Sequence, residues 1–167
     1  MKRFFTLIIF LLSISISGFS QLSNAQAMFL LNFSRLIKWP DTQSQGEFVF
    51  GVLGNQDVFN SLVTITAGKK VGLQPIVVKF YNDPREINTC HVIFIANSKI
   101  SQFNELLARV QNKASLVVTE KTGMVNSGST IDFVLAGNKL RYIVSEENAR
   151  KNNLVLSKNL QDMAMVN

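Results

Sequence analysis

The stretch from Cys90 to Ala96 constrains the fold most, because it is apolar almost without interruption. A strand with one face in water alternates apolar and polar side chains, whereas a strand covered on both faces reads as a continuous apolar run. The stretch therefore predicts a strand inside a sheet that has helices on both faces.

Segments with strand character alternate along the chain with segments of helical periodicity. The expected strands span residues 48–53, 75–80, 90–96, 115–119, 130–135 and 140–144. The expected helices span residues 24–38, 57–66, 101–110 and 158–163. This alternation predicts an α/β fold: a central mixed, largely parallel sheet with helices on both faces and a C-terminal antiparallel hairpin.

Local signals add detail to the predicted elements. The first helix is expected to be capped by Ser23 or Asn24 and to end near Pro40. Its apolar stripe is formed by Met28, Leu31 and Leu36, flanked by Phe29, Phe33 and Ile37. The hairpin is expected to turn around Gly137-Asn138, and Ser145 is expected to cap a short helix that begins with Glu146 and Glu147.

Residues 1–20 have the layout of a secretory signal peptide. A basic start precedes an apolar run at positions 4–16 that is too short to span a bilayer comfortably, and small residues follow it. An uncleaved N-terminal anchor is the alternative, and a lipoprotein is disfavoured because no cysteine follows the run. We expect export, a mature protein that begins near Gln21, and a single α/β domain at residues 21–167.

The basic charge is scattered. Removing Lys2 and Arg3 with the signal peptide lowers the formal net charge from +6 to +4, and the remaining basic pairs are Lys69-Lys70 and Arg150-Lys151. Nucleic-acid-binding proteins concentrate such charge on one face or stripe. The pattern favours a solvated surface and argues against nucleic acid as a partner.

The sequence shows no set of titratable residues that is expected to come together as a catalytic site. Cys90 and His91 are the only cysteine and histidine, and neighbours in a strand point to opposite faces, so they cannot form a nucleophile–base pair. They are also too few for a zinc site. We expect no catalytic residue, metal or cofactor, and a buried Cys90 thiol; an exposed thiol open to intermolecular pairing is the alternative.

Two glycine-containing segments could contact a ligand. Gly51 to Gly54 lacks the third glycine of a dinucleotide-binding motif, so a tight turn is the better interpretation. The loop from Gly123 to Ser129 could wrap an anion with its backbone N–H groups, although loop geometry explains it equally well. The candidate ligand-binding residues are Ser127, Gly128, Ser129 and Arg141.

Three segments together resemble the YfiR-like family of exported bacterial proteins. Asn32 to Pro40 is similar to the family signature N-F-x-x-[FL]-[IV]-x-W-P. Cys90 to Ser98 is similar to its C-H-[VI]-[VIL]-[FY]-[IV] strand, and matching residues continue from Gly123 to Leu160.

The resemblance implies a periplasmic α/β domain without known catalytic activity. It further implies a negative regulator that binds the periplasmic part of an inner-membrane diguanylate cyclase and restrains cyclic-di-GMP signalling and biofilm formation. Homodimers are known in the family. Some relatives carry cysteine pairs and respond to redox conditions, whereas this chain has Cys90 alone.

The partner-binding candidates are Trp39, Leu154, Leu156 and Leu160, each of which could instead close the core. A binding module for a small molecule or cell-wall fragment is the alternative function, and an exported hydrolase is a third. A pocket lined by Asp132, Arg141 and loop N–H groups would favour the ligand binder. A flat apolar patch would favour the regulator.

Overall fold

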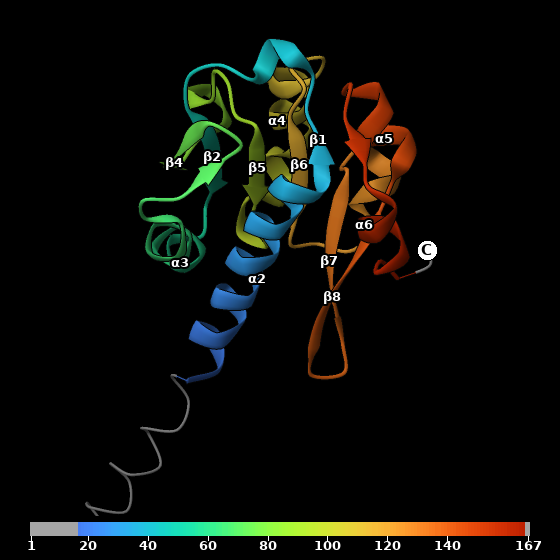
Figure 1. Cartoon of the computed structure of the whole chain (residues 1–167). Helices are drawn as coiled ribbons and strands as arrows, with labels where there is room; N and C mark the ends of the chain where they lie inside the picture. Colours follow the sequence, from blue (N-terminus) through green and yellow to red (C-terminus); the bar gives the residue numbers. More distant parts are fainter. Residues whose placement is uncertain (1–16, 166–167) are drawn as a thin grey trace, which may run out of the picture.

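The computed structural model describes residues 17–165, so most of the predicted signal segment lies outside the described residues. In this part of the chain a seven-stranded sheet has the order β3-β4-β2-β5-β6-β7-β8 (Figure 1). The strands are β2 (Phe48–Leu53), β3 (Lys70–Val71), β4 (Gln74–Tyr81), β5 (Val92–Ile95), β6 (Leu116–Thr119), β7 (Ile131–Ala136) and β8 (Lys139–Val144). The central strands pair in parallel, and β3 and β8 pair antiparallel at the two edges. The predicted mixed, largely parallel sheet with a C-terminal hairpin is confirmed.

Helices cover both faces of this sheet, as predicted. They are α2 (Ser17–Leu36), α3 (Gln56–Thr66), α4 (Phe103–Val110), α5 (Glu146–Lys151) and α6 (Lys158–Asp162). Alternate side chains of β2 enter two separate cores: Phe50 packs on the side of α2 and α3, and Leu53 packs on the side of α4. Figure 1 shows α2 crossing one face of the sheet diagonally. No helix among residues 17–165 is long and apolar enough to cross a membrane.

The predicted bounds of the first helix are wrong at both ends. Helical backbone is already present at Ser17, so Ser23 and Asn24 lie inside α2 and cap nothing. At the other end, Ile37–Lys38 leave the helix as β1 and pair antiparallel with Val155–Leu156, which form β9. The chain extends here because a residue that precedes proline, such as Trp39 before Pro40, is driven out of helical geometry.

The buried face of α2 also differs from the predicted stripe. Leu31 is buried as expected, but Met28 is 58% exposed. The face that packs on the sheet runs through Ala27, Leu30 and Phe33, whose spacing follows the helical repeat. The predicted stripe omitted the small residue Ala27, so apolar periodicity alone gave the wrong orientation for the buried face of the helix.

Cys90 is buried beneath α4, as predicted. Its side chain is 4% exposed, and its Sγ lies 3.7 Å from the hydroxyl oxygen of Tyr81. Gly51 makes room for this contact, since a Cβ at that position would lie 2.8 Å from the sulfur and 2.6 Å from Ile93.

Candidate partner-binding site

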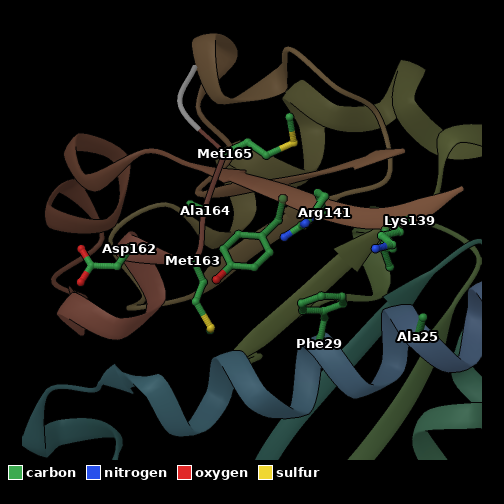
Figure 2. A pocket seen from close by; sticks show the side chains of 10 residues that line it. Ala25, Phe29, Lys139, Arg141, Asp162, Met163, Ala164 and Met165 are labelled. Carbon is green, nitrogen blue, oxygen red and sulfur yellow. The ribbon is translucent and has the colours of Figure 1, made fainter. Parts of the chain in front are cut away.

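A groove of about 630 Å³ lies between α2, the edge strand β8 and the residues that follow α6 (Figure 2). Its apolar lining comes from three separate parts of the chain, namely Phe29 on α2, Leu140 and Tyr142 on β8, and Met163 and Met165 beyond α6. Met163 is 49% exposed and Met165 is 39% exposed. Exposed methionines suit a binding surface, because their flexible thioethers adapt to the shape of a partner.

Two cations lie at the rim of this groove. Lys139 and Arg141 are exposed on β8, and among residues 17–165 no carboxylate forms a salt bridge with either. Asp162 also lines the groove, and Figure 2 shows it at the opposite end from Lys139. The end of the groove beside β8 is therefore positively charged, and it suits a partner that carries acidic side chains.

Tyr142 forms the floor of the groove and fixes its shape. Its ring meets Phe33 edge-on at 4.9 Å between centroids and Phe29 at 5.6 Å. Its hydroxyl donates to the carbonyl oxygen of Leu160 at 2.9 Å, and its own carbonyl oxygen accepts from the N–H of Met165 at 2.8 Å. These bonds tie α6 and the C-terminal segment to β8, so the walls of the groove are already in place without a partner.

The three leucines predicted as partner contacts are buried instead. Leu154, Leu156 and Leu160 are 1%, 5% and 0% exposed, so they do not form the apolar docking patch expected of them. For Leu154 and Leu156 the physical reason is the pairing of β9 with β1, which directs alternate side chains inward. Leu160 instead enters the core from α6. Val155, between two of the leucines, is 60% exposed.

Trp39 is half-buried and lies three residues after the end of α2, beside the first residue of β2. Its indole N–H donates to the carbonyl oxygen of Ser34 at 3.2 Å. Its ring packs edge-on against Phe48 at 5.2 Å and His91 at 5.7 Å. These contacts favour the core-closing interpretation, and a direct partner contact by Trp39 stays a prediction.

The loop from Gly123 to Ser129 folds around a buried carboxylate. Asp132 is 0% exposed and accepts hydrogen bonds from the hydroxyls of Thr119 and Ser129 and from the N–H of Val125. The loop therefore uses these polar groups internally, and they are not directed to a ligand.

The predicted ligand residues are not brought together. Gly128 lines a cavity with Leu107 and Asn148, whereas Arg141 lines the groove beside α2. Ser127 is exposed and Ser129 is buried. Within the described residues, Arg141 and Gly128 thus line different cavities, and ligand binding by the loop stays a prediction.

His91 and Cys90 are not arranged for catalysis. The Nδ1 atom of His91 accepts from the N–H of Val49 at 3.1 Å, and Nε2 lies 3.1 Å from the carbonyl oxygen of Gln43. Its ring stacks on Phe48, on the opposite side of the sheet from Cys90, as predicted.

Burial raises the pKa of the Cys90 thiol and so disfavours the reactive thiolate. Within the described residues, no three histidine, cysteine, aspartate or glutamate side chains are grouped to hold a metal.

The sequence pattern missed the groove because it depends on residues far apart in the chain. Phe29 was assigned to the flank of a helix, and Lys139, Met163 and Met165 carried no recognised motif. The one available signal was the apolar run Met163-Ala164-Met165-Val166, which begins at the last residue of the last predicted helix.

The structure is that of an α/β domain with a groove whose walls are held in place by the domain's own hydrogen bonds. The sequence description of the YfiR/HmsC-like family matches residues 23–165, so the chain belongs to this family. No curated protein matches the chain. Members of the family are periplasmic regulatory proteins, and the family is not an enzymatic one.

Proposed function

We propose that this protein is a non-enzymatic periplasmic regulator that binds and restrains the periplasmic sensor domain of an inner-membrane diguanylate cyclase. The observation that carries the proposal is the family match, which spans residues 23–165. The groove supports it further, since it offers apolar walls and two cations on a surface open to a macromolecular partner.

Restraint of a cyclase requires a difference in affinity between two states of its sensor domain. A regulator that bound both states equally would shift neither population, however tightly it bound. The groove is fixed in shape by the bonds of Tyr142 to Leu160 and Met165. A preformed surface of this kind discriminates between partner conformations, because only one of them places its complementary side chains correctly.

A binding measurement with matched variants tests this proposal. Residues 21–167 would be titrated against the isolated periplasmic domains of the diguanylate cyclases encoded in the same genome. Met163→Asp places a charge in an apolar contact and is expected to weaken binding at least about tenfold. Leu73→Asp is the matched control, since Leu73 is 91% exposed and lies on the turn between β3 and β4. Equal binding by the two variants would contradict the assignment of the groove, and no binding to any cyclase domain would contradict the partner class.

The volume of the groove favours one alternative. At about 630 Å³ it falls within the range of roughly 300–1,000 Å³ that small-molecule sites occupy. In this second function the domain would bind a small molecule or a soluble cell-wall fragment. A rise in melting temperature with muropeptides, lost in Met163→Asp and kept in Leu73→Asp, would favour this alternative over the cyclase.

A further inference from the structure

The outer edge of β8 carries backbone groups that point away from the sheet. The N–H of Ser145 donates to the carbonyl oxygen of Thr130 at 2.9 Å. Together with the register of β7 and β8, this bond shows which residues of β8 form hydrogen-bonded pairs with β7. Because hydrogen-bonded pairs alternate with non-bonded pairs along an antiparallel ladder, the N–H and C=O groups of Leu140 and Tyr142 face outward.

The end of the chain already uses one of these outward groups. The N–H of Met165 donates to the carbonyl oxygen of Tyr142 at 2.8 Å. Among residues 17–165, no other chain segment pairs with this side of β8, since β8 is the last strand in the order of the sheet. An edge of this kind is a template for a further strand.

The side chains on the two faces of an added strand would contact different parts of the protein. Leu140 and Tyr142 face the groove below α2, and Lys139 and Arg141 alternate with them along β8. Side chains of an added strand alternate in the same way. One set would enter the apolar groove beside Phe29, and the other set would lie beside the two cations.

Charge argues against a second copy of the chain as the occupant. In the antiparallel registers that pair Leu140 of one copy with Leu140 or Tyr142 of the other, Arg141 would lie opposite Lys139 or Arg141 of the second copy. Like charges that face each other across strands are destabilising. Acidic side chains at alternate positions would instead be attracted.

We propose that the edge of β8 binds an extended segment of the regulated partner by strand addition, with apolar and acidic side chains alternating along that segment. The proposal rests on the regulatory function proposed above and identifies the part of the partner that this surface recognises. Main-chain hydrogen bonds to the N–H and C=O of Leu140 and to the N–H of Tyr142, whose carbonyl oxygen already accepts from Met165, contribute affinity. The groove and the cations contribute specificity.

Amide hydrogen exchange gives the most direct test. The probe is a six-residue peptide of alternating glutamate and valine with blocked ends, and the control peptide carries lysine in place of glutamate. Strand addition predicts that the amide protons of Leu140 and Tyr142 exchange at least about tenfold more slowly with the glutamate peptide. The amide of Arg141, which already faces β7, should not change. Side-chain docking without strand addition would leave all three unchanged and would overturn the proposal.

A proline substitution supplies a second, independent test. Leu140→Pro removes an outward N–H without removing a bond to β7, and edge strands tolerate proline at such positions. We expect it to weaken binding of the glutamate peptide about tenfold, whereas Leu140→Val, which keeps the N–H, binds as the wild type does. Equal binding by the proline and valine variants would overturn the proposal, as would dimerisation of the free protein that already protects Leu140 and Tyr142.

These results separate the two proposals. If the cyclase domain binds and Met163→Asp weakens it, but the amides of Leu140 and Tyr142 gain no protection, strand addition fails and the regulatory function stands. If these amides are protected but no cyclase domain binds, the edge is a peptide-binding surface and the cyclase is the wrong partner.

Discussion

The hydroxyl of Tyr142 donates to the carbonyl oxygen of Leu160 at 2.9 Å, although the two residues belong to a strand and a helix that meet only in the folded chain. This bond sets the position of α6 against β8. The position of α6 in turn places Met163 and Met165 along the groove.

Tyr142→Phe should therefore loosen this end of the molecule. The variant keeps the aromatic packing with Phe29 and Phe33 but leaves the carbonyl of Leu160 without its buried donor. We expect a loss of about 1 kcal/mol in the free energy of unfolding, measured by urea denaturation. An unchanged transition midpoint would show that the bond contributes nothing to stability.

Asp132→Ala should lower the free energy of unfolding more than Tyr142→Phe does, because it leaves several buried hydrogen-bond donors without an acceptor. Three groups donate to this carboxylate, from Thr119, Val125 and Ser129. Their loss should lower the free energy of unfolding by on the order of 3 kcal/mol. Ser127→Ala, at an exposed position in the same loop, is the control and should stay within about 0.5 kcal/mol of the wild type. Similar values for the two variants would contradict the structural role of Asp132.

His91 should make the fold sensitive to mild acid. Burial lowers the pKa of its imidazole below the ordinary value of 6.5, and the backbone hydrogen bond to Gln43 opposes this only in part. Since the unfolded chain binds a proton more readily than the folded one, this contribution is constant above the unfolded pKa and is lost as the pH falls below about 6.5. Protonation would also remove the acceptor that Nδ1 offers to the N–H of Val49.

Unfolding midpoints between pH 8 and pH 5 would measure this effect. The wild type should lose stability across the lower part of that range, and His91→Gln should show a smaller slope. Parallel slopes for the two proteins would assign the pH dependence to other groups.

Cys90 should be unreactive in the folded protein. Its side chain is 4% exposed, and burial raises its pKa, so both access and thiolate content are low. A thiol reagent should label it slowly in buffer and rapidly in denaturant, and Cys90→Ser should leave regulation intact. Rapid labelling of the folded protein would contradict the buried thiol.

The sheet could be predicted from sequence where the pattern was local. The bounds of β2 match the predicted strand at residues 48–53, and the continuous apolar run forms β5 with cores on both faces. Ser145 caps α5 as expected, since its hydroxyl accepts from the N–H of Asn148.

The site was harder to predict because it depends on long-range pairing. The β1–β9 ribbon has two residues on each side, too few to produce a periodic pattern, and this ribbon decides that Leu156 points inward. The groove likewise joins Phe29 to Met165, whose proximity depends on the order of the strands and not on their composition. Sequence therefore indicated the kind of fold and the family, whereas the interaction surface required the structure.

Restraint of a membrane cyclase by this protein can be measured through the intracellular concentration of cyclic-di-GMP. Its concentration would be compared in the wild type, in a strain that lacks this protein, and in the same strain complemented with the wild-type gene or with Met163→Asp. We expect deletion to raise cyclic-di-GMP and the wild-type gene to restore the lower concentration, whereas Met163→Asp folds but does not restore it. An unchanged concentration after deletion, in a strain that contains cyclases with periplasmic sensor domains, would contradict the restraint of a cyclase by this protein.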